Sequence, residues 1–244
     1  MADFTPVQAR KIVLLDLDGT LIASHPGILA SVRKMFEGLG LAVPPEEELR
    51  RFIGPSIADS LRRNHVEESL IPEGIAIYRK YYNDYASFED PAGSGHLLPG
   101  SLCSSVFPGI PAQLEDLRSS GFHLSVASCK PEYQARPICQ HFRLDALLDD
   151  IFGASRDGSR VEKAQVISYG FAQLGFNPDA GDRALMVGDR WTDADGAQAL
   201  GLDCLGCGWG YAEDDELSAH GCYRVINHVN QLSQAVNEYF MSLN

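Results

Sequence analysis

The amino-acid sequence predicts an α/β fold with a parallel-sheet core and a small inserted α-helical domain. Segments 12–15, 122–128 and 184–187 are short and rich in apolar residues, as buried parallel strands are, and a polar residue ends or follows each one. Stretches with the i, i+3, i+4 spacing of amphipathic helices separate them. Between residues 22 and 98 no convincing strand pattern occurs. These three observations predict a helical insert within an alternating strand–helix chain.

The length and charge of the chain limit its partners. The 244 residues suit one large domain or a core with a small insert. A formal charge of −13 at pH 7 argues against nucleic acid or an anionic membrane as a partner. A phosphorylated ligand would be repelled too, so a phosphate site needs local positive charge from a metal ion, a lysine or backbone amides.

The sequence also bears on the compartment in which the protein is expected. No apolar run approaches the roughly 20 residues of a membrane span, and residues 1–10 lack the basic start and apolar core of a signal peptide. The six cysteines are scattered, and the single CxxC, Cys204 and Cys207, has no second pair at ligand spacing. We therefore expect a reduced, cytoplasmic protein.

The first predicted strand leads into two carboxylates. The apolar run 12–15 ends at Asp16, and Asp18 follows two residues later, on the same side of an extended chain. Ligands of α/β folds lie at this carboxyl end of the strands. Gly19 permits a sharp turn, and Thr20 can bond the local backbone. Close like charges repel unless a cation or a shared proton offsets them, so this stretch is a candidate site rather than a solvated turn.

The helical insert follows directly. Helical spacing is expected from Pro26 onward, from 45 to 52 and from 72 to 85, with Ser56 as the N-cap of a further helix after a turn at 54–56. The last helix is rich in tyrosines, which we interpret as packing. Segment 88–100, with three glycines and two prolines, is expected to be a linker.

Polar residues again end the later strands. Ser128 closes the strand 122–128, and a short strand is expected at 150–153. Lys163 begins a helix over 161–174, where a positive charge opposes the helix dipole, which favours function over a solvated face. Asp189 follows the strand 184–187, and Asp193 lies one helical turn further on. The remaining predicted elements are a helix at 193–200, a strand at 203–206, a solvated helix start at 213–216, a strand at 223–226 and a helix at 229–240.

Four of these segments resemble, in order, the motifs of the haloacid dehalogenase-like (HAD) hydrolase superfamily. They are DLDGTL at 16–21, SCKP at 128–131, the lysine at 163 and GDRWTD at 188–193. The resemblance implies a Rossmann-like HAD core formed by 1–21 and 101–244, and a C1-type helical cap formed by 22–100. SCKP and the segment 52–55 are similar to phosphoglycolate phosphatases.

The resemblance also implies roles for the site residues. Asp16 would be the nucleophile and Asp18 the general acid/base, with Ser128 and Lys163 holding the phosphoryl group. Mg²⁺ would be held by Asp16, Asp189 and the backbone carbonyl of Asp18, with Asp193 orienting a bound water. The substrate-binding residues expected in addition are Leu17, Gly19, Thr20, Cys129, Arg51 and Ser56.

The predicted activity is Mg²⁺-dependent hydrolysis of a small phosphorylated metabolite through an aspartyl phosphate, with 2-phosphoglycolate as a leading candidate. A 5′-nucleotidase, a sugar-phosphate phosphatase or a pyrophosphatase of the same family would share these motifs. A phosphomutase is the first rival, although Thr20 after the glycine favours a phosphatase. A non-catalytic binding protein with a preserved site is the alternative from another class. We expect specificity to reside in the insert, around Arg50, Arg51, Phe52 and Ser56.

Overall fold

The computed structural model describes residues 9–54 and 56–243, and it divides into two compact units. One unit is the chain up to Leu21 together with the chain from Val106 onward, and the other is Ile22–Ser105. Pro55, part of the turn expected at 54–56, lies outside the described residues. Within the described ranges no helix is long and apolar enough to cross a membrane.

The first unit is built on a six-stranded sheet in which every neighbouring pair of strands is parallel. Strand β1 lies near its centre, and its residues Ile12 to Leu15 are completely buried between β8 and β6. This burial on both faces explains why the strand is an unbroken apolar run. In spatial order the strands are β10 (Arg224–Ile226), β9 (Cys204–Cys207), β8 (Arg183–Gly188), β1 (Lys11–Leu15), β6 (His123–Pro131) and β7 (Asp150–Ala154).

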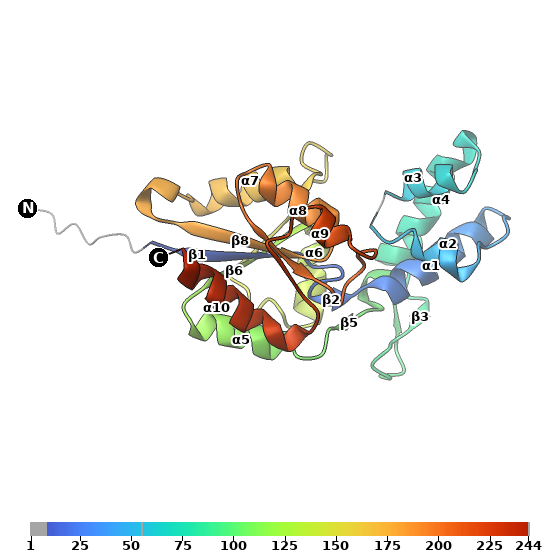
Figure 1. Cartoon of the computed structure of the whole chain (residues 1–244). Coiled ribbons are helices and arrows are strands. Elements are labelled where there is room, and N and C mark those ends of the chain that lie inside the picture. Colours follow the sequence, from blue (N-terminus) through green and yellow to red (C-terminus); the bar gives the residue numbers. More distant parts are fainter. Residues whose placement is uncertain (1–8, 55, 244) are drawn as a thin grey trace, which may run out of the picture. The chain divides into compact units, whose positions relative to one another are not determined.

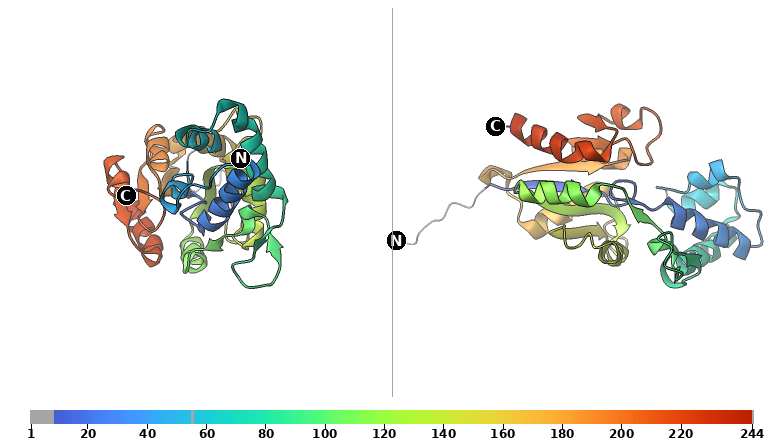
Figure 2. Two further views of the ribbon diagram at one scale, coloured as in Figure 1. Left: turned by 90° about the vertical axis from the view of Figure 1, so that its right-hand side faces the viewer. Right: turned by 90° about the horizontal axis from the view of Figure 1, so that it is seen from below.

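Helices cover both faces of this sheet. Helices α7 and α8 pack together on one face, and α5 and α10 lie side by side on the other (Figure 1). The second pair is also visible in Figure 2. The predicted α/β class, with a parallel sheet and added helical elements, is thereby confirmed. The helices are α5 (Ile110–Ser119), α6 (Glu132–His141), α7 (Lys163–Leu174), η4 (Pro178–Ala180), α8 (Trp191–Gln198), α9 (Glu216–Ala219), η5 (Val229–Gln231) and α10 (Leu232–Ser242).

The second unit is mainly helical and has a hydrophobic core of its own. Phe52 is 2% exposed and packs edge-on against Phe36, and Tyr82 is buried and stacks on Tyr78. The tyrosine-rich helix therefore contributes to packing, as the sequence indicated. The helices are α1 (His25–Gly38), α2 (Glu46–Arg50), α3 (Ile57–Arg63), η1 (Glu68–Leu70), α4 (Ile71–Arg79), the π-helix η2 (Lys80–Asp84) and η3 (Gly100–Leu102).

Some predicted boundaries were wrong. The segment 88–100 is not a plain linker, because β3 (Phe88–Glu89) pairs antiparallel with β4 (Leu97–Leu98). Two further strands, β2 (Ile22–Ala23) and β5 (Ser105–Val106), pair where the chain passes between the units. Each of these strands is two residues long, too short for any periodicity to be seen in the sequence.

Two corrections fall in the first unit. Strand β6 continues to Pro131 instead of ending at 128, with a register shift against β7 between Ala127 and Pro131. The acidic run 213–216 is only partly solvated. Its last member, Glu216, accepts a hydrogen bond from Arg190 Nε at 2.8 Å and another from the Trp191 backbone N–H at 2.8 Å.

Candidate active site

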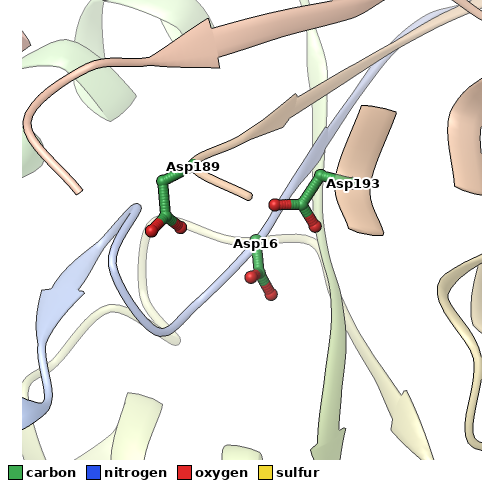
Figure 3. A group of neighbouring side chains, drawn as sticks. All are labelled: Asp16, Asp189 and Asp193. Carbon is green, nitrogen blue, oxygen red and sulfur yellow. The ribbon is translucent and has the colours of Figure 1, made fainter. Parts of the chain in front are cut away.

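Three aspartates converge at the carboxyl edge of the sheet, two of them directly after strands and one in a helix that follows. Asp16 follows β1 and is tied to β8 because its N–H donates to the Val187 carbonyl at 2.9 Å. Asp189 follows β8, and Asp193 lies in the first turn of α8. Each offers a carboxylate oxygen within 4.8 Å of those of the others, and all three residues are buried (Figure 3). Sequence reasoning placed all three at one site, and the structure brings them together.

Asp189 sits in a slot between two glycine backbones. A Cβ added at Gly19 would lie 2.1 Å from Asp189 Oδ2, and one added at Gly210 would lie 2.2 Å from Asp189 Cβ. Gly19 also has a φ of +86°, which disfavours other residues. Thr20 Oγ1 donates to Asp189 Oδ1 at 2.9 Å, and the Tyr211 N–H donates to Oδ2 at 2.8 Å. One bond on each oxygen leaves each with a lone pair for a cation.

Lys163 links the nucleophile candidate to Asp193. Its Nζ lies 2.9 Å from Asp16 Oδ1 and 2.6 Å from Asp193 Oδ1, and it donates to the Ala127 carbonyl at 2.8 Å. Helix α7, which carries Lys163, can approach α8 closely because Gly196 has no side chain. A Cβ added at Gly196 would lie 2.6 Å from Lys163 Cβ. Asp193 Oδ2 also accepts the Arg190 N–H at 3.0 Å, so the start of α8 orients this carboxylate.

Burial and crowding shift the proton affinities of these groups. Burial raises the pKa of Asp189 well above its ordinary value, and the charges of Asp193 and Asp16 raise it further. Burial raises the pKa of Asp193 to about 6 even though Lys163 opposes the change. Burial alone would lower the pKa of Lys163, but Asp16 and Asp193 outweigh it, so its pKa is raised and the ammonium stays charged.

Asp18 takes a different partner. Lys130 Nζ lies 3.0 Å from Asp18 Oδ2, and the Asp18 side chain is 24% exposed. Four carboxylates thus face two lysines at this edge of the sheet, an excess of two negative charges when all are ionised. A hard divalent cation held by carboxylate oxygens would remove that excess. The donor set of Asp16, Asp189 and Asp193 therefore fits a metal ion.

The other predicted residues of the first unit lie near this edge but differ in availability. Ser128 is buried at 2% exposure and its Oγ accepts the Lys130 N–H at 3.2 Å, which is compatible with donation of the hydroxyl proton. The Leu17 side chain is fully buried, so only its backbone can meet a ligand. The hydroxyl of Thr20 is engaged by Asp189, whereas Cys129 is exposed.

The two predicted residues of the second unit are engaged locally. Arg51 Nη1 lies 2.9 Å from Glu48 Oε1 on an exposed surface. Ser56 accepts the Asp59 N–H at 3.1 Å as the N-cap of α3, as predicted, and its hydroxyl donates to Asp59 Oδ2 at 2.6 Å. Neither contact prevents a role in substrate binding.

Sequence reasoning missed two features of the site. Lys130 was read only as part of a motif, although it follows Ser128 at the i, i+2 spacing that had singled out the two aspartates. The loop after β9 also went unused: the Trp209 indole N–H donates to the Thr20 carbonyl at 3.2 Å, and Tyr211 binds Asp189. Its Gly-Trp-Gly sequence was the available signal.

The fold and this site define a hydrolase class, and comparison with known proteins agrees. Residues 13–207 match the model of the haloacid dehalogenase-like hydrolase family, and the chain belongs to that family. It is therefore a HAD-family enzyme, which confirms the family and enzyme class predicted from its motifs.

Individual relatives differ in name. The chain is 38% identical over 211 residues to the tyrosine-protein kinase PtkA of Mycobacterium tuberculosis, covering 86% of this chain and 66% of PtkA. The chain thus spans about two thirds of the length of that relative. It is 34% identical to a 5′-nucleotidase of Pseudomonas aeruginosa, covering 85% and 87% of the two chains. It is 28% identical to a phosphoglycolate phosphatase of Aquifex aeolicus, covering 83% and 87%.

A solved structure supports the fold. The crystal structure of a predicted phosphatase from Clostridium acetobutylicum matches with a TM-score of 0.79 and 32% identity, covering 94% of this chain and 99% of that one.

Proposed function

We propose that this protein is a Mg²⁺-dependent phosphomonoesterase that works through an aspartyl phosphate on Asp16. One observation carries the proposal: Asp16 lies buried among Asp189, Asp193 and the ammonium of Lys163, with a second carboxylate two residues away. This arrangement supplies a nucleophile, a cation site and a separate acid/base group.

The residues would divide the reaction between them. An Oδ atom of Asp16 forms a bond to phosphorus while the bond from phosphorus to the leaving oxygen breaks, and the carboxyl proton of Asp18 passes to that oxygen. Water then attacks phosphorus, Asp18 takes a proton from it, and the bond to Asp16 breaks to release inorganic phosphate. Lys163, Ser128 and the amides after Asp16 would hold the equatorial oxygens, where charge accumulates.

Asp16, Asp189 and the backbone carbonyl of Asp18 would hold the Mg²⁺ ion, with Asp193 orienting its water. When bound, the ion offsets the repulsion between an anionic nucleophile and an anionic phosphate. The choice of Mg²⁺ rests on the all-oxygen donor set, because hard cations prefer such ligands.

The substrate we propose is a small phosphorylated metabolite. 2-Phosphoglycolate was the leading candidate from the motifs, but the similarity to the 5′-nucleotidase is greater than that to the phosphoglycolate phosphatase, so nucleoside 5′-monophosphates stand beside it. We propose that the second unit is the cap and selects among substrates. Arg50, whose side chain is 72% exposed, is more available to contact a substrate than Phe52, which is buried in the core of that unit.

The test uses purified protein and a panel of phosphate esters that includes both candidates, with inorganic phosphate release as the readout. We expect Mg²⁺-dependent turnover that chelation abolishes, and no turnover by Asp16→Asn, because an amide can neither attack phosphorus nor give the ion an anionic ligand. Asp116→Asn, on α5 of the same unit, is the matched control. Turnover in excess chelator, or near-normal activity of Asp16→Asn, would refute the proposal.

A second candidate function is phosphoryl transfer to an acceptor other than water. The similarity to PtkA favours tyrosine as an acceptor, and a phosphomutase would use a sugar phosphate. Incubation with ATP and detection of phosphotyrosine, and separately with sugar monophosphates and detection of a bisphosphate, would establish either activity. Hydrolysis of the panel without either product favours the phosphatase.

A further inference from the structure

The two aspartates of the first motif have separate lysine partners. Asp16 pairs with Lys163, whereas the Asp18 side chain pairs with Lys130, which is 6% exposed. Asp18 Oδ1 is buried and makes no hydrogen bond within the described residues. The ion pair with Lys130 therefore holds Oδ2 of this carboxylate in place. Lysine is seldom buried unless its charge is paired, and Asp18 supplies the opposite charge beside Lys130.

The backbone around Lys130 is held in place. Its N–H donates to Ser128 Oγ at 3.2 Å, just where β6 shifts its register against β7. The backbone at Lys130 lies close to strand β7 because Gly153 of that strand has no side chain. A Cβ added at Gly153 would lie 2.6 Å from the Lys130 carbonyl oxygen. A rigid backbone at this point fixes where the Lys130 side chain begins.

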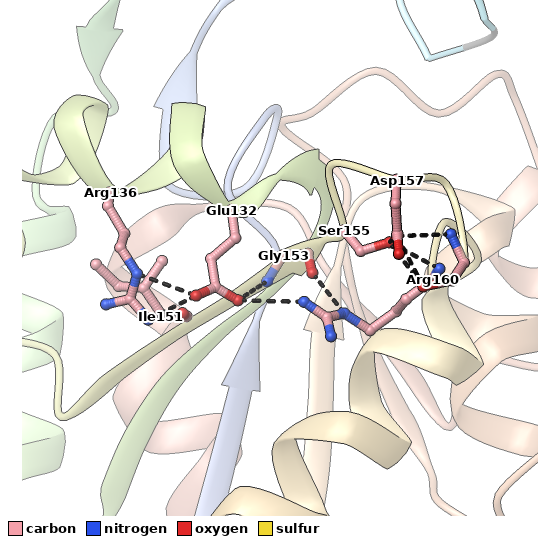
Figure 4. Close-up of polar contacts among 8 residues, drawn as sticks. Glu132, Arg136, Ile151, Gly153, Ser155, Asp157 and Arg160 are labelled. Atoms are coloured by element: carbon pink, nitrogen blue, oxygen red, sulfur yellow. Dashed lines mark hydrogen bonds and ion pairs between the residues drawn. The ribbon is translucent and has the colours of Figure 1, made fainter.

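Glu132 anchors the next turn of the chain (Figure 4). Its carboxylate accepts from Arg136 Nη2 at 2.8 Å and from the Gly153 N–H at 3.4 Å, and it pairs with Arg160 at 3.4 Å. Arg136 and Arg160 also donate to the carbonyls of Ile151 and Gly153, at 2.9 Å each. These bonds connect the start of α6 to β7 and to the loop that follows β7, and they fix the position of the segment that carries Lys130.

We propose that Lys130 is a positioning residue that holds the carboxylate of Asp18 where it can protonate the leaving group. This inference rests on the proposed function, because it assigns Asp18 the acid/base role. Asp18 precedes a glycine turn and lies outside the cluster formed by Asp16, Asp189 and Asp193. Without Lys130 its side chain loses the contact that fixes its rotamer. Proton transfer needs the acid within hydrogen-bond reach of the leaving oxygen, so a displaced carboxyl transfers its proton more slowly.

The experiment compares leaving groups. An alkyl phosphate needs its leaving oxygen protonated, whereas p-nitrophenyl phosphate leaves readily without a proton. kcat/KM reports the steps up to departure of the leaving group, so later hydrolysis of the aspartyl phosphate does not enter. We expect Lys130→Met to lower kcat/KM for the alkyl phosphate at least about tenfold more than for p-nitrophenyl phosphate, within the range of general acid contributions. Asp18→Asn should give the same pattern.

Two further variants and a control complete the test. Lys130→Arg should restore much of the lost ratio, since it keeps a cation, and Lys130→Gln gives a second substitution if the methionine variant folds poorly. Lys34→Met, which removes an exposed ion pair with Glu37 in the second unit, should leave the ratio unchanged.

An equal loss of kcat/KM for both substrates would overturn the inference, because a structural or substrate-binding role would produce it. An unchanged ratio would overturn it as well. If wild-type protein hydrolysed neither substrate, the proposed function itself would fail, and that outcome is distinguishable from the other two.

Discussion

Replacement of Lys163 by methionine tests the electrostatic balance of the site. The Lys163 side chain is 2% exposed, and its ammonium lies 2.9 Å from Asp16 and 2.6 Å from Asp193. Methionine has a similar length and fills the same space. The substitution therefore removes the charge with little change in packing, and it leaves three buried carboxylates without the cation that pairs with two of them.

The expected loss of stability depends on pH. Breaking a buried ion pair by removing one partner costs about 3–5 kcal/mol. Carboxylates left alone reduce this cost by taking up protons, and the pKa of Asp193 is already raised to about 6. When a carboxyl group has a higher pKa in the folded protein than in the unfolded chain, the folded protein loses stability as the pH rises. The loss occurs between the pKa of the unfolded chain and the pKa of the folded protein. The variant should therefore lose about 3–5 kcal/mol near pH 8 and clearly less near pH 5.

The assay is urea unfolding followed by circular dichroism, in EDTA, for wild-type protein and Lys163→Met at both pH values. Lys34→Met is the control, because its ion pair is exposed and its removal should not be measurable. Added Mg²⁺ should stabilise the variant more than wild type, since its site carries one more negative charge. A destabilisation below about 1 kcal/mol at pH 8, or a larger one at pH 5, would refute the reasoning.

Three further outcomes follow from the structure. Asp182→Asn should destabilise the protein by about 1–2 kcal/mol at pH 7, because hydrogen bonds and charge from Arg10 lower the pKa of Asp182 to about 2, and the difference in urea midpoint should shrink as pH falls from about 4 to 2. Gly210→Ala should weaken Mn²⁺ binding measured by electron paramagnetic resonance, because its Cβ would displace Asp189; an unchanged affinity would contradict the close fit. Inorganic phosphate should bind measurably in Mg²⁺ but not in EDTA by calorimetry; equal binding in both would contradict the charge argument.

The sequence was sufficient to predict the site residues that directly follow predicted strands. Parallel strands place their carboxyl ends at one edge, so polar residues that follow apolar runs must meet there. Asp16 and Asp189 illustrate this, and they come together although 173 positions separate them. Lys163 was found because a lysine at a helix start is electrostatically misplaced, and its buried ion pairs supply the reason.

Features that depend on side-chain partners could not be predicted in the same way. The i, i+2 spacing placed Asp16 and Asp18 on one side, but the chain turns after β1, and each aspartate has its own lysine. The hairpin of β3 and β4 left no alternation to detect, because each strand has two residues. The contacts of Trp209 and Tyr211 arise from a loop whose path is set by backbone hydrogen bonds rather than by residue pattern.

The charge of the chain and the charge of its site pose one electrostatic problem. If the proposed function holds, a protein with a formal charge of −13 binds a phosphate dianion next to four carboxylates, and within the described residues two lysines pair with three of them. Burial makes the repulsion stronger because the local dielectric constant is low. Protonation of Asp189 or Asp193 would relieve it, as their raised pKa values indicate, but a divalent cation relieves it without removing the anionic ligands. We therefore expect the metal ion to be required for phosphate to bind, as well as for the chemistry that follows.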